Sequence, residues 1–159
     1  MNFEEIRRNA TAEWEALVNS ETPLIFVGTA TCGRSSGALK LLDFIDTQLR
    51  SRHLDARVME VGCIGCCYLE PLVDIAKRGH PRVCYSRVTP EIVSRLITDY
   101  LVNDNPRPDL ALCTMGKGKV DGIPNLLDLP MFKPQVRIAL RNCGYIDPGN
   151  INHYIANGG

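Results

Sequence analysis

Cysteine is the residue type in this 159-residue chain that most clearly suggests chemistry, because three of its seven cysteines fall within five residues. Cys63, Cys66 and Cys67 lie in the stretch VGCIGCCYLEPLV, after an apolar run and before a proline. Cys32 follows a separate apolar run, in GTATCGRSSG. A single cysteine usually belongs to an apolar core, but the glycines around the triplet favour a loop. Thiolates gathered on loops suit an iron–sulfur cluster, a zinc ion or thiol redox chemistry.

Two predicted strands must position these thiols. Residues 23–29 (PLIFVGT) and 56–61 (ARVMEV) are short, apolar and rich in β-branched residues, which favours strands. Residues 35–53 have the spacing of an amphipathic helix, for which Ser35 or Ser36 is the expected N-cap. If the two strands are neighbours in a sheet, the loops that leave them can lie at the same end. Cys32 would then meet the loop that carries the triplet.

The remaining pattern predicts an α/β fold with helices on a mixed sheet. An amphipathic helix is expected within residues 1–22, and a compact domain over residues 23–102 that ends with a hairpin and a helix from Thr89. Frequent prolines predict an extended arm over residues 103–159. Within this arm, VRIAL (136–140) is a possible strand and the segment at 147–156 a short terminal helix.

Other chemistry is less well supported. CIGC is a C-x-x-C motif, but a helix-bound redox dithiol is disfavoured because Pro71 and a β-prone run follow it. Structural zinc remains possible, since Cys32 and the triplet offer four thiols. The segment GKGKVDG lacks the context of a nucleotide-binding loop. The other cysteines are expected in the apolar core: Cys84, Cys113 and Cys143. The histidines are expected at the surface: His53, His80 and His153.

The charge balance limits the classes of partner. Lysine and arginine together number 18, as do aspartate and glutamate, so the net charge gives no case for binding nucleic acid or an anionic membrane. The N-terminal sequence contains no apolar secretory segment, and no apolar run is long enough to insert into a membrane. These features predict a cytoplasmic protein, in which clustered thiols serve metal or redox chemistry rather than structural disulfides.

Three segments together resemble a known family. GTATCGRSSGALKLL, GCIGCCYLEPLVDI and CYSRVTPEIV resemble the thioredoxin-like [2Fe–2S] ferredoxin domain. More narrowly, they resemble its copy at the N-terminus of the flavin-bearing, NADH-oxidising subunits of complex I-type dehydrogenases, hydrogenases and formate dehydrogenases. The tail MFKPQVRIALRNCGYIDPGNINHYIANGG resembles the segment that leads into the flavin domain of those subunits. The resemblance covers residues 23–159 and implies a thioredoxin-like fold.

The resemblance also implies a ligand set. Cys32, Cys63 and Cys67 match three of the four family cysteines that hold the [2Fe–2S] cluster. The fourth is expected a few residues before Cys32, where this chain has valine, glycine and threonine at 27–29. Cys66 is the candidate for the missing ligand. Arginines at 34 and 87 are expected to border the cluster.

The function implied is electron transfer within a cytoplasmic NAD(P)H-linked redox complex. The expected partners are a flavoprotein domain or subunit and other iron–sulfur subunits. The sequence printed ends at Gly159, before the glycine-rich loop and the [4Fe–4S] cysteines of the family, so FMN and NAD sites and a complete oxidoreductase active site are expected to be absent. Because one family cysteine is missing, a docking domain without a cluster, in the same kind of complex, is the alternative.

Overall fold

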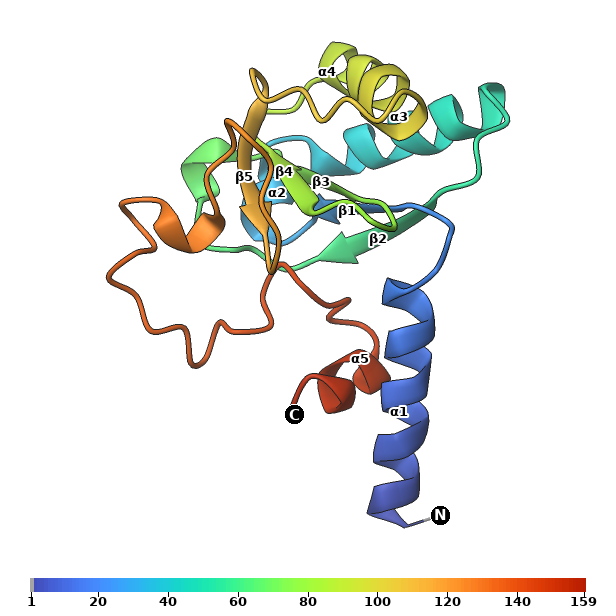
Figure 1. Cartoon of the computed structure of the whole chain (residues 1–159), viewed down its shortest axis with the longest axis vertical. Coiled ribbons are helices and arrows are strands. Elements are labelled where there is room, and N and C mark those ends of the chain that lie inside the picture. Colours follow the sequence, from blue (N-terminus) through green and yellow to red (C-terminus); the bar gives the residue numbers. More distant parts are fainter. Residues whose placement is uncertain (1) are drawn as a thin grey trace.

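A five-stranded mixed sheet forms the centre of the computed structural model, which describes residues 2–159. The strand order is β2-β1-β3-β4-β5 (Figure 1). The first strand pairs in parallel with the second, and the remaining pairs are antiparallel. The strands are β1 (Leu24–Gly28), β2 (Arg57–Val61), β3 (Val73–Ala76), β4 (Arg82–Tyr85) and β5 (Ala111–Met115). The predicted α/β class with a mixed sheet is therefore confirmed.

The helices begin where local capping allows. The Thr89 hydroxyl accepts a hydrogen bond from the backbone N–H of Ile92 at the start of α4, as expected for an N-cap. A π-helical segment, Ile97–Val102, continues this helix. None of the helices within residues 2–159 is long and apolar enough to cross a membrane. The helices are α1 (Phe3–Val18), α2 (Thr31–Ser35), α3 (Ala38–Ser51), α4 (Pro90–Leu96) and α5 (Ile151–Ala156).

The expected start of the second helix was wrong. Neither Ser35 nor Ser36 caps it, because residues 31–35 form the separate short helix α2. Gly37 then adopts a left-handed conformation, with φ of +95°, and α3 begins at Ala38. Glycine takes this conformation without the steric cost that a Cβ atom would bring. The break matters for function because it places Cys32 inside α2 rather than in a loop.

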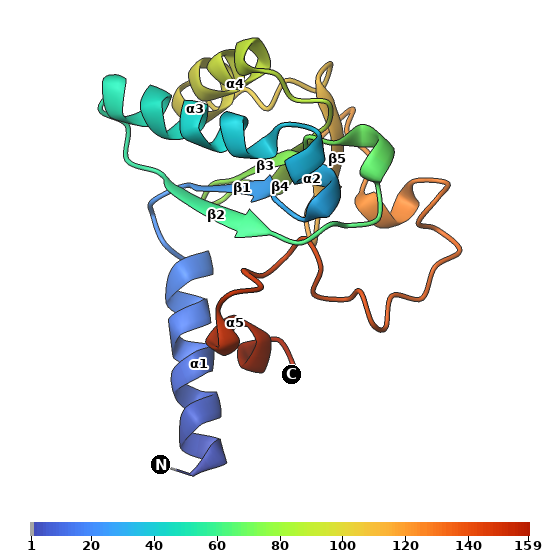
Figure 2. The ribbon, with the colours of Figure 1, turned by 180° about the vertical axis from the view of Figure 1, so that it is seen from behind.

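The two faces of the sheet are covered differently. Helices α3 and α4 lie together over one face (Figures 1 and 2). Ile25 and Val27 of β1 join the core on this side, together with Leu41 of α3 and Leu96 of α4. The alternate residues of β1 belong to a second cluster, in keeping with the period of two of a strand. A third apolar cluster includes Phe132, so the C-terminal segment rather than a pair of helices contributes to this part of the core.

Two features of the C-terminal segment differ from expectation. Strand β5 lies within the segment expected to be an arm, and it extends the sheet beside β4. The segment 136–140 is irregular rather than a strand. Val136 and Ile138 are 85% and 78% exposed, so this β-prone stretch has no sheet edge or core on which to pack.

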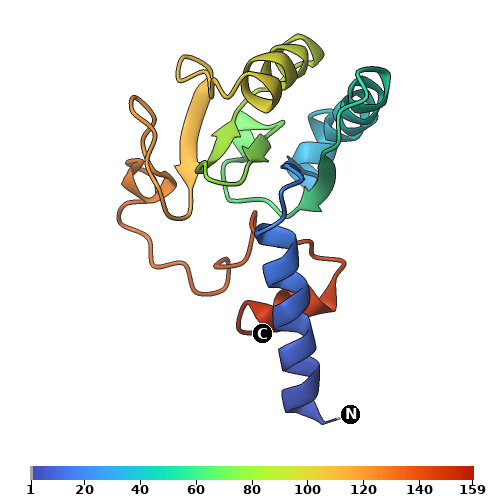
Figure 3. The same cartoon turned by 45° about the vertical axis from the view of Figure 1, so that its right-hand side comes forward.

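The terminal helix predicted within residues 147–156 is present as α5, and it packs against α1 away from the sheet (Figure 3). The ring of His153 meets the ring of Trp14 edge-on, with centroids 4.9 Å apart. Glu13 accepts hydrogen bonds from the side-chain amides of Asn150 and Asn152. The expectation of an exposed His153 was therefore wrong, because α1 buries it; the histidines at 53 and 80 are exposed as expected.

Candidate metal centre

Cys32 lies in α2, which follows closely on β1. A Cβ atom added at Gly33 would lie 1.9 Å from the carbonyl oxygen of Gly28, so the helix can pack here only because residue 33 is glycine. The side chain of Arg34 donates a hydrogen bond from Nε to the carbonyl oxygen of Thr29, at 2.8 Å. These two contacts tie the helix that carries Cys32 to the carboxyl end of β1.

The triplet lies on the loop that leaves β2. Because β1 and β2 are parallel, this loop and α2 are at the same edge of the sheet. Gly65 adopts a φ of +102°, and its backbone N–H donates a hydrogen bond to the sulfur of Cys63 at 3.3 Å. A 3₁₀ turn, Cys67–Leu69, then brings the sulfur of Cys67 to 3.6 Å from that of Cys63.

The structure brings Cys32, Cys63 and Cys67 together, with all three sulfur atoms within 4.8 Å of one another. The first two residues are half-buried and Cys67 is exposed. Burial is the main cause that raises the pKa of Cys32 to about 12, and it also raises the pKa of Cys63. Without a metal these two groups are therefore thiols near neutral pH, whereas a bound metal would stabilise the thiolates.

Cys66 points elsewhere. Its side chain is 1% exposed and belongs to an apolar cluster that also contains Ile64 and Cys113. Burial raises the pKa of Cys66 to about 11. Cys84 and Cys113 face each other across paired strands in the core, as expected, and Cys143 is half-buried.

Glu70 is the one residue of this region that the sequence reasoning missed. Its side chain is only 8% exposed, and Oε1 lies 3.6 Å from the sulfur of Cys32. The other carboxylate oxygen accepts a 2.8 Å hydrogen bond from the backbone N–H of Leu72. Burial is the main cause that raises the pKa of Glu70. Its position three residues after Cys67, between a cysteine cluster and a buried strand, was the available signal.

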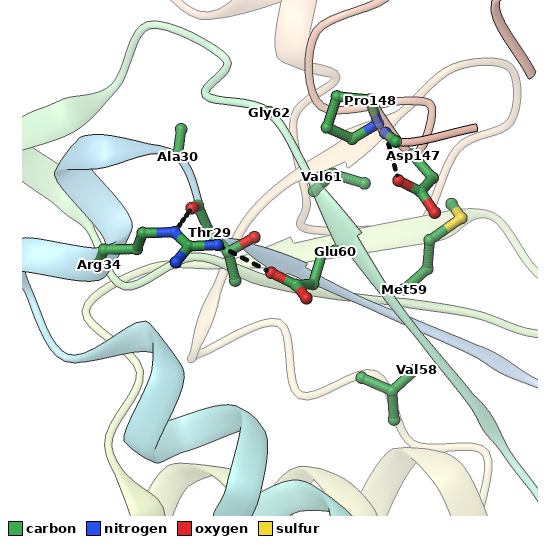
Figure 4. A pocket seen from close by; sticks show the side chains of 11 residues that line it. Thr29, Ala30, Arg34, Val58, Met59, Glu60, Val61, Gly62, Asp147 and Pro148 are labelled. Atoms are coloured by element: carbon green, nitrogen blue, oxygen red, sulfur yellow. Dashed lines mark hydrogen bonds and ion pairs between the residues drawn. The ribbon is translucent and has the colours of Figure 1, made fainter. Parts of the chain in front are cut away.

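A cavity of about 600 Å³ opens beside the centre, at the carboxyl ends of β1 and β2 (Figure 4). Thr29 and Gly62 line it from the sheet, and residues 147–149 line it from the C-terminal segment. Figure 4 shows Arg34 directed toward Glu60, and the two side chains form an ion pair at 3.6 Å. The charge of this arginine is thus already opposed by a carboxylate.

The donor set fits an iron–sulfur cluster in its chemistry. Soft thiol sulfurs from α2 and from the loop after β2 converge, and the Gly65 N–H group donates a hydrogen bond to one of them, as N–H groups do around cluster sulfurs. Three thiols do not complete either a [2Fe–2S] site or a tetrahedral zinc site, both of which take four ligands. A [2Fe–2S] cluster or a structural zinc ion held by these three thiols would need a fourth donor.

Comparisons with known proteins relate this fold to ferredoxins. No family model matches the chain. The NADP-reducing hydrogenase subunit HndB of Solidesulfovibrio fructosivorans is 26% identical over 108 residues, which cover 66% of this chain and 85% of that protein. A thioredoxin-like [2Fe–2S] ferredoxin from Aquifex aeolicus superposes with a TM-score of 0.51 at 18% identity, covering 65% of this chain and 99% of the ferredoxin. The wild-type crystal structure of that ferredoxin at 1.5 Å gives a TM-score of 0.48 at 19% identity, covering 58% and 97% of the two chains. The superposition with a TM-score of 0.51 shows that the chain has the thioredoxin-like fold that its sequence resemblance implied.

Proposed function

We propose that this chain is an electron-transfer module that carries one [2Fe–2S] cluster in an NAD(P)H-linked redox complex of the cytoplasm. The convergence of Cys32, from α2, with Cys63 and Cys67, from the segment after β2, is the observation that carries the proposal. The thioredoxin-like fold, which the chain shares with a [2Fe–2S] ferredoxin, supports it. Similarity to a subunit of an NADP-reducing hydrogenase supports a place in a complex of several subunits. The partners that the sequence resemblance suggests are a flavoprotein and other iron–sulfur subunits.

The residues around the thiols would perform three tasks. The cysteine sulfurs hold the cluster, which would supply one-electron redox chemistry when bound. The N–H group of Gly65 stabilises negative charge on the sulfur of Cys63. Ile64, next to Cys63, is buried, whereas Cys67 is exposed, so the centre adjoins the apolar core and is also open to solvent. A redox partner would approach from the open side, since electron transfer requires close approach.

Anaerobic reconstitution with ferrous iron and sulfide tests the proposal. We expect a brown protein with about two irons and two sulfides per chain, whose visible absorption bleaches with dithionite and whose reduced form gives a rhombic EPR signal. Metal analysis of protein purified without reconstitution tests for zinc in the same sample. A colourless product after reconstitution of folded protein would refute the proposal.

A docking domain without a cluster is the second candidate. The exposed Val136 and Ile138 favour it, because such side chains are suited to a partner surface. The double variant Cys63→Ala/Cys67→Ala separates the two candidates. Loss of electron transfer with intact assembly would support the electron carrier, whereas unchanged assembly and unchanged electron transfer would support the docking domain.

A further inference from the structure

The side chain of Glu70 is the strongest unexplained feature beside the three thiols. It is a buried carboxylate, and within residues 2–159 it belongs to no ion pair. Lys40 and Arg87 line a cavity of about 370 Å³ together with Glu70, yet neither is among the ion pairs formed within residues 2–159. An anionic side chain without a cation is costly to bury. An iron ion held at the adjacent thiols could bind this carboxylate directly and so stabilise its negative charge.

The spacing of the donor atoms gives a second reason. Metal–sulfur bonds of about 2.3 Å and metal–oxygen bonds of about 2.0–2.2 Å, at tetrahedral angles, separate two sulfurs by about 3.8 Å and a sulfur from an oxygen by about 3.6 Å. Cys63 and Cys67 have sulfurs 3.6 Å apart, and the sulfur of Cys32 lies 3.6 Å from Oε1 of Glu70. Each pair thus has the separation of two ligands on one metal.

The backbone leaves room for this carboxylate. A Cβ atom at Gly28 would lie 3.1 Å from Oε2 of Glu70, and one at Gly33 would lie 3.3 Å from the same oxygen. The carboxylate thus lies against two positions that have no side chain, directly between the end of β1 and α2. No thiol is available at residues 27–29, and Cys66 faces the apolar cluster.

Resting on the proposed function, we infer that Glu70 is the fourth ligand of the cluster, so that Glu70 and Cys32 hold one iron while Cys63 and Cys67 hold the other. Replacement of cysteine by another ligand on one iron is chemically possible, as histidine ligation in Rieske centres illustrates. A carboxylate carries the same charge as a thiolate. The total charge of the ligand set is therefore the same as that of four cysteines.

Substitutions at Glu70, measured on anaerobically reconstituted protein, test the inference. Glu70→Gln keeps an acceptor for the N–H group of Leu72 but removes the anionic donor, and Glu70→Ala removes both. We expect both variants to lose iron to a chelator at least about tenfold more readily than the unchanged protein. We expect Glu70→Cys to retain iron and sulfide while the EPR g-values of the reduced protein change. Circular dichroism melts of the metal-free variants check that each one folds.

Two matched variants serve as controls. Glu60→Gln alters an exposed carboxylate near the centre, and Cys66→Ala removes the competing thiol; both should leave iron retention and g-values unchanged. Iron retention and g-values in folded Glu70→Ala that equal those of the unchanged protein would overturn the inference, as would loss of the cluster in folded Cys66→Ala. In either case the unchanged protein still holds its cluster and the proposed function stands. Failure of the unchanged protein itself to take up iron would overturn both.

Discussion

Replacing Gly33 by alanine should destabilise the protein, although helix propensity alone predicts the opposite. Alanine is favoured over glycine within a helix by about 1 kcal/mol. In α2, however, the added Cβ atom would approach the carbonyl oxygen of Gly28 to 1.9 Å, about 1.1 Å short of the 3.0 Å below which Cβ contacts are essentially never seen. The carbonyl oxygen is a backbone atom and the backbone also fixes the position of the Cβ atom, so no side-chain rotation can relieve the contact.

The expected loss follows from these two opposing effects. Overpacking of this kind costs about 1–3 kcal/mol, and a backbone–backbone contact belongs at the upper end of that range. After the gain in helix propensity is subtracted, the free energy of unfolding should fall by about 2 kcal/mol. For a chain of this size that corresponds to a decrease in Tm of about 4–8 °C. The same displacement would move Cys32 away from the triplet and weaken iron retention.

Urea and thermal unfolding of the metal-free protein measure this effect. Gly62→Ala is the matched control, because Gly62, like Gly33, is the neighbour in sequence of a cysteine of the centre, but an added Cβ atom there would meet nothing closer than 4.0 Å. Its free energy of unfolding should change by less than about 0.5 kcal/mol. If Gly33→Ala proved as stable as the unchanged protein, or more stable, the close approach of α2 to β1 would be refuted.

Three further predictions concern other parts of the molecule. Arg82→Met should lower the free energy of unfolding by about 3–5 kcal/mol, because it leaves the buried Asp74 without its partner. Urea unfolding should show a smaller loss when Arg82→Met is combined with Asp74→Asn, which removes the unpaired charge. In metal-free protein at pH 8, mass spectrometry after brief treatment with iodoacetamide should find the exposed Cys67 modified before Cys32, whose raised pKa of about 12 leaves little thiolate; faster modification of Cys32 would contradict the burial of that thiol. The hydrogen bonds from α5 lower the pKa of Glu13 below its ordinary value of 4.5. They therefore stabilise the docking of α5 at pH values above 4.5, and this stabilisation is lost as the pH falls through the lowered pKa of Glu13. Hydrogen exchange over residues 151–156 should therefore speed up in acid, and Glu13→Gln should remove this pH dependence.

Local sequence patterns predicted the elements whose structure depends on local preference. The apolar runs gave β1 and β2, and the three- and four-residue spacing of apolar side chains gave α1, α3 and α4. The missed elements depend on distant partners instead. Strand β5 is defined by its pairing with β4, across a helix and a proline-rich connection. Helix α2 has only five residues, one of them glycine, and it forms against the end of β1.

The order of strands and helices allowed the meeting of the cysteines at one edge of the sheet to be predicted, but not the direction of each side chain. Parallel pairing of β1 with β2 brings the following segments to one edge, so the approach of Cys32 to the triplet could be expected from the order of elements. The direction of each side chain within the triplet could not be expected, because Cys66 and Cys67 are adjacent and chemically identical. That choice depends on a left-handed residue, Gly65, and on the short turn that follows it.

Residue type alone suggests that Cys66 is the metal ligand and that Glu70 is not. The 3₁₀ turn between them explains why the structure favours the opposite assignment. In a 3₁₀ turn, side chains three residues apart project from the same side. Cys66 and Leu69 are one such pair, and both contribute to the apolar cluster beneath the loop. Cys67 and Glu70 are the next pair, and both adjoin the other thiols, Cys67 at Cys63 and Glu70 at Cys32. The turn therefore directs one of two neighbouring thiols into the core, and it brings a carboxylate to the metal centre in its place.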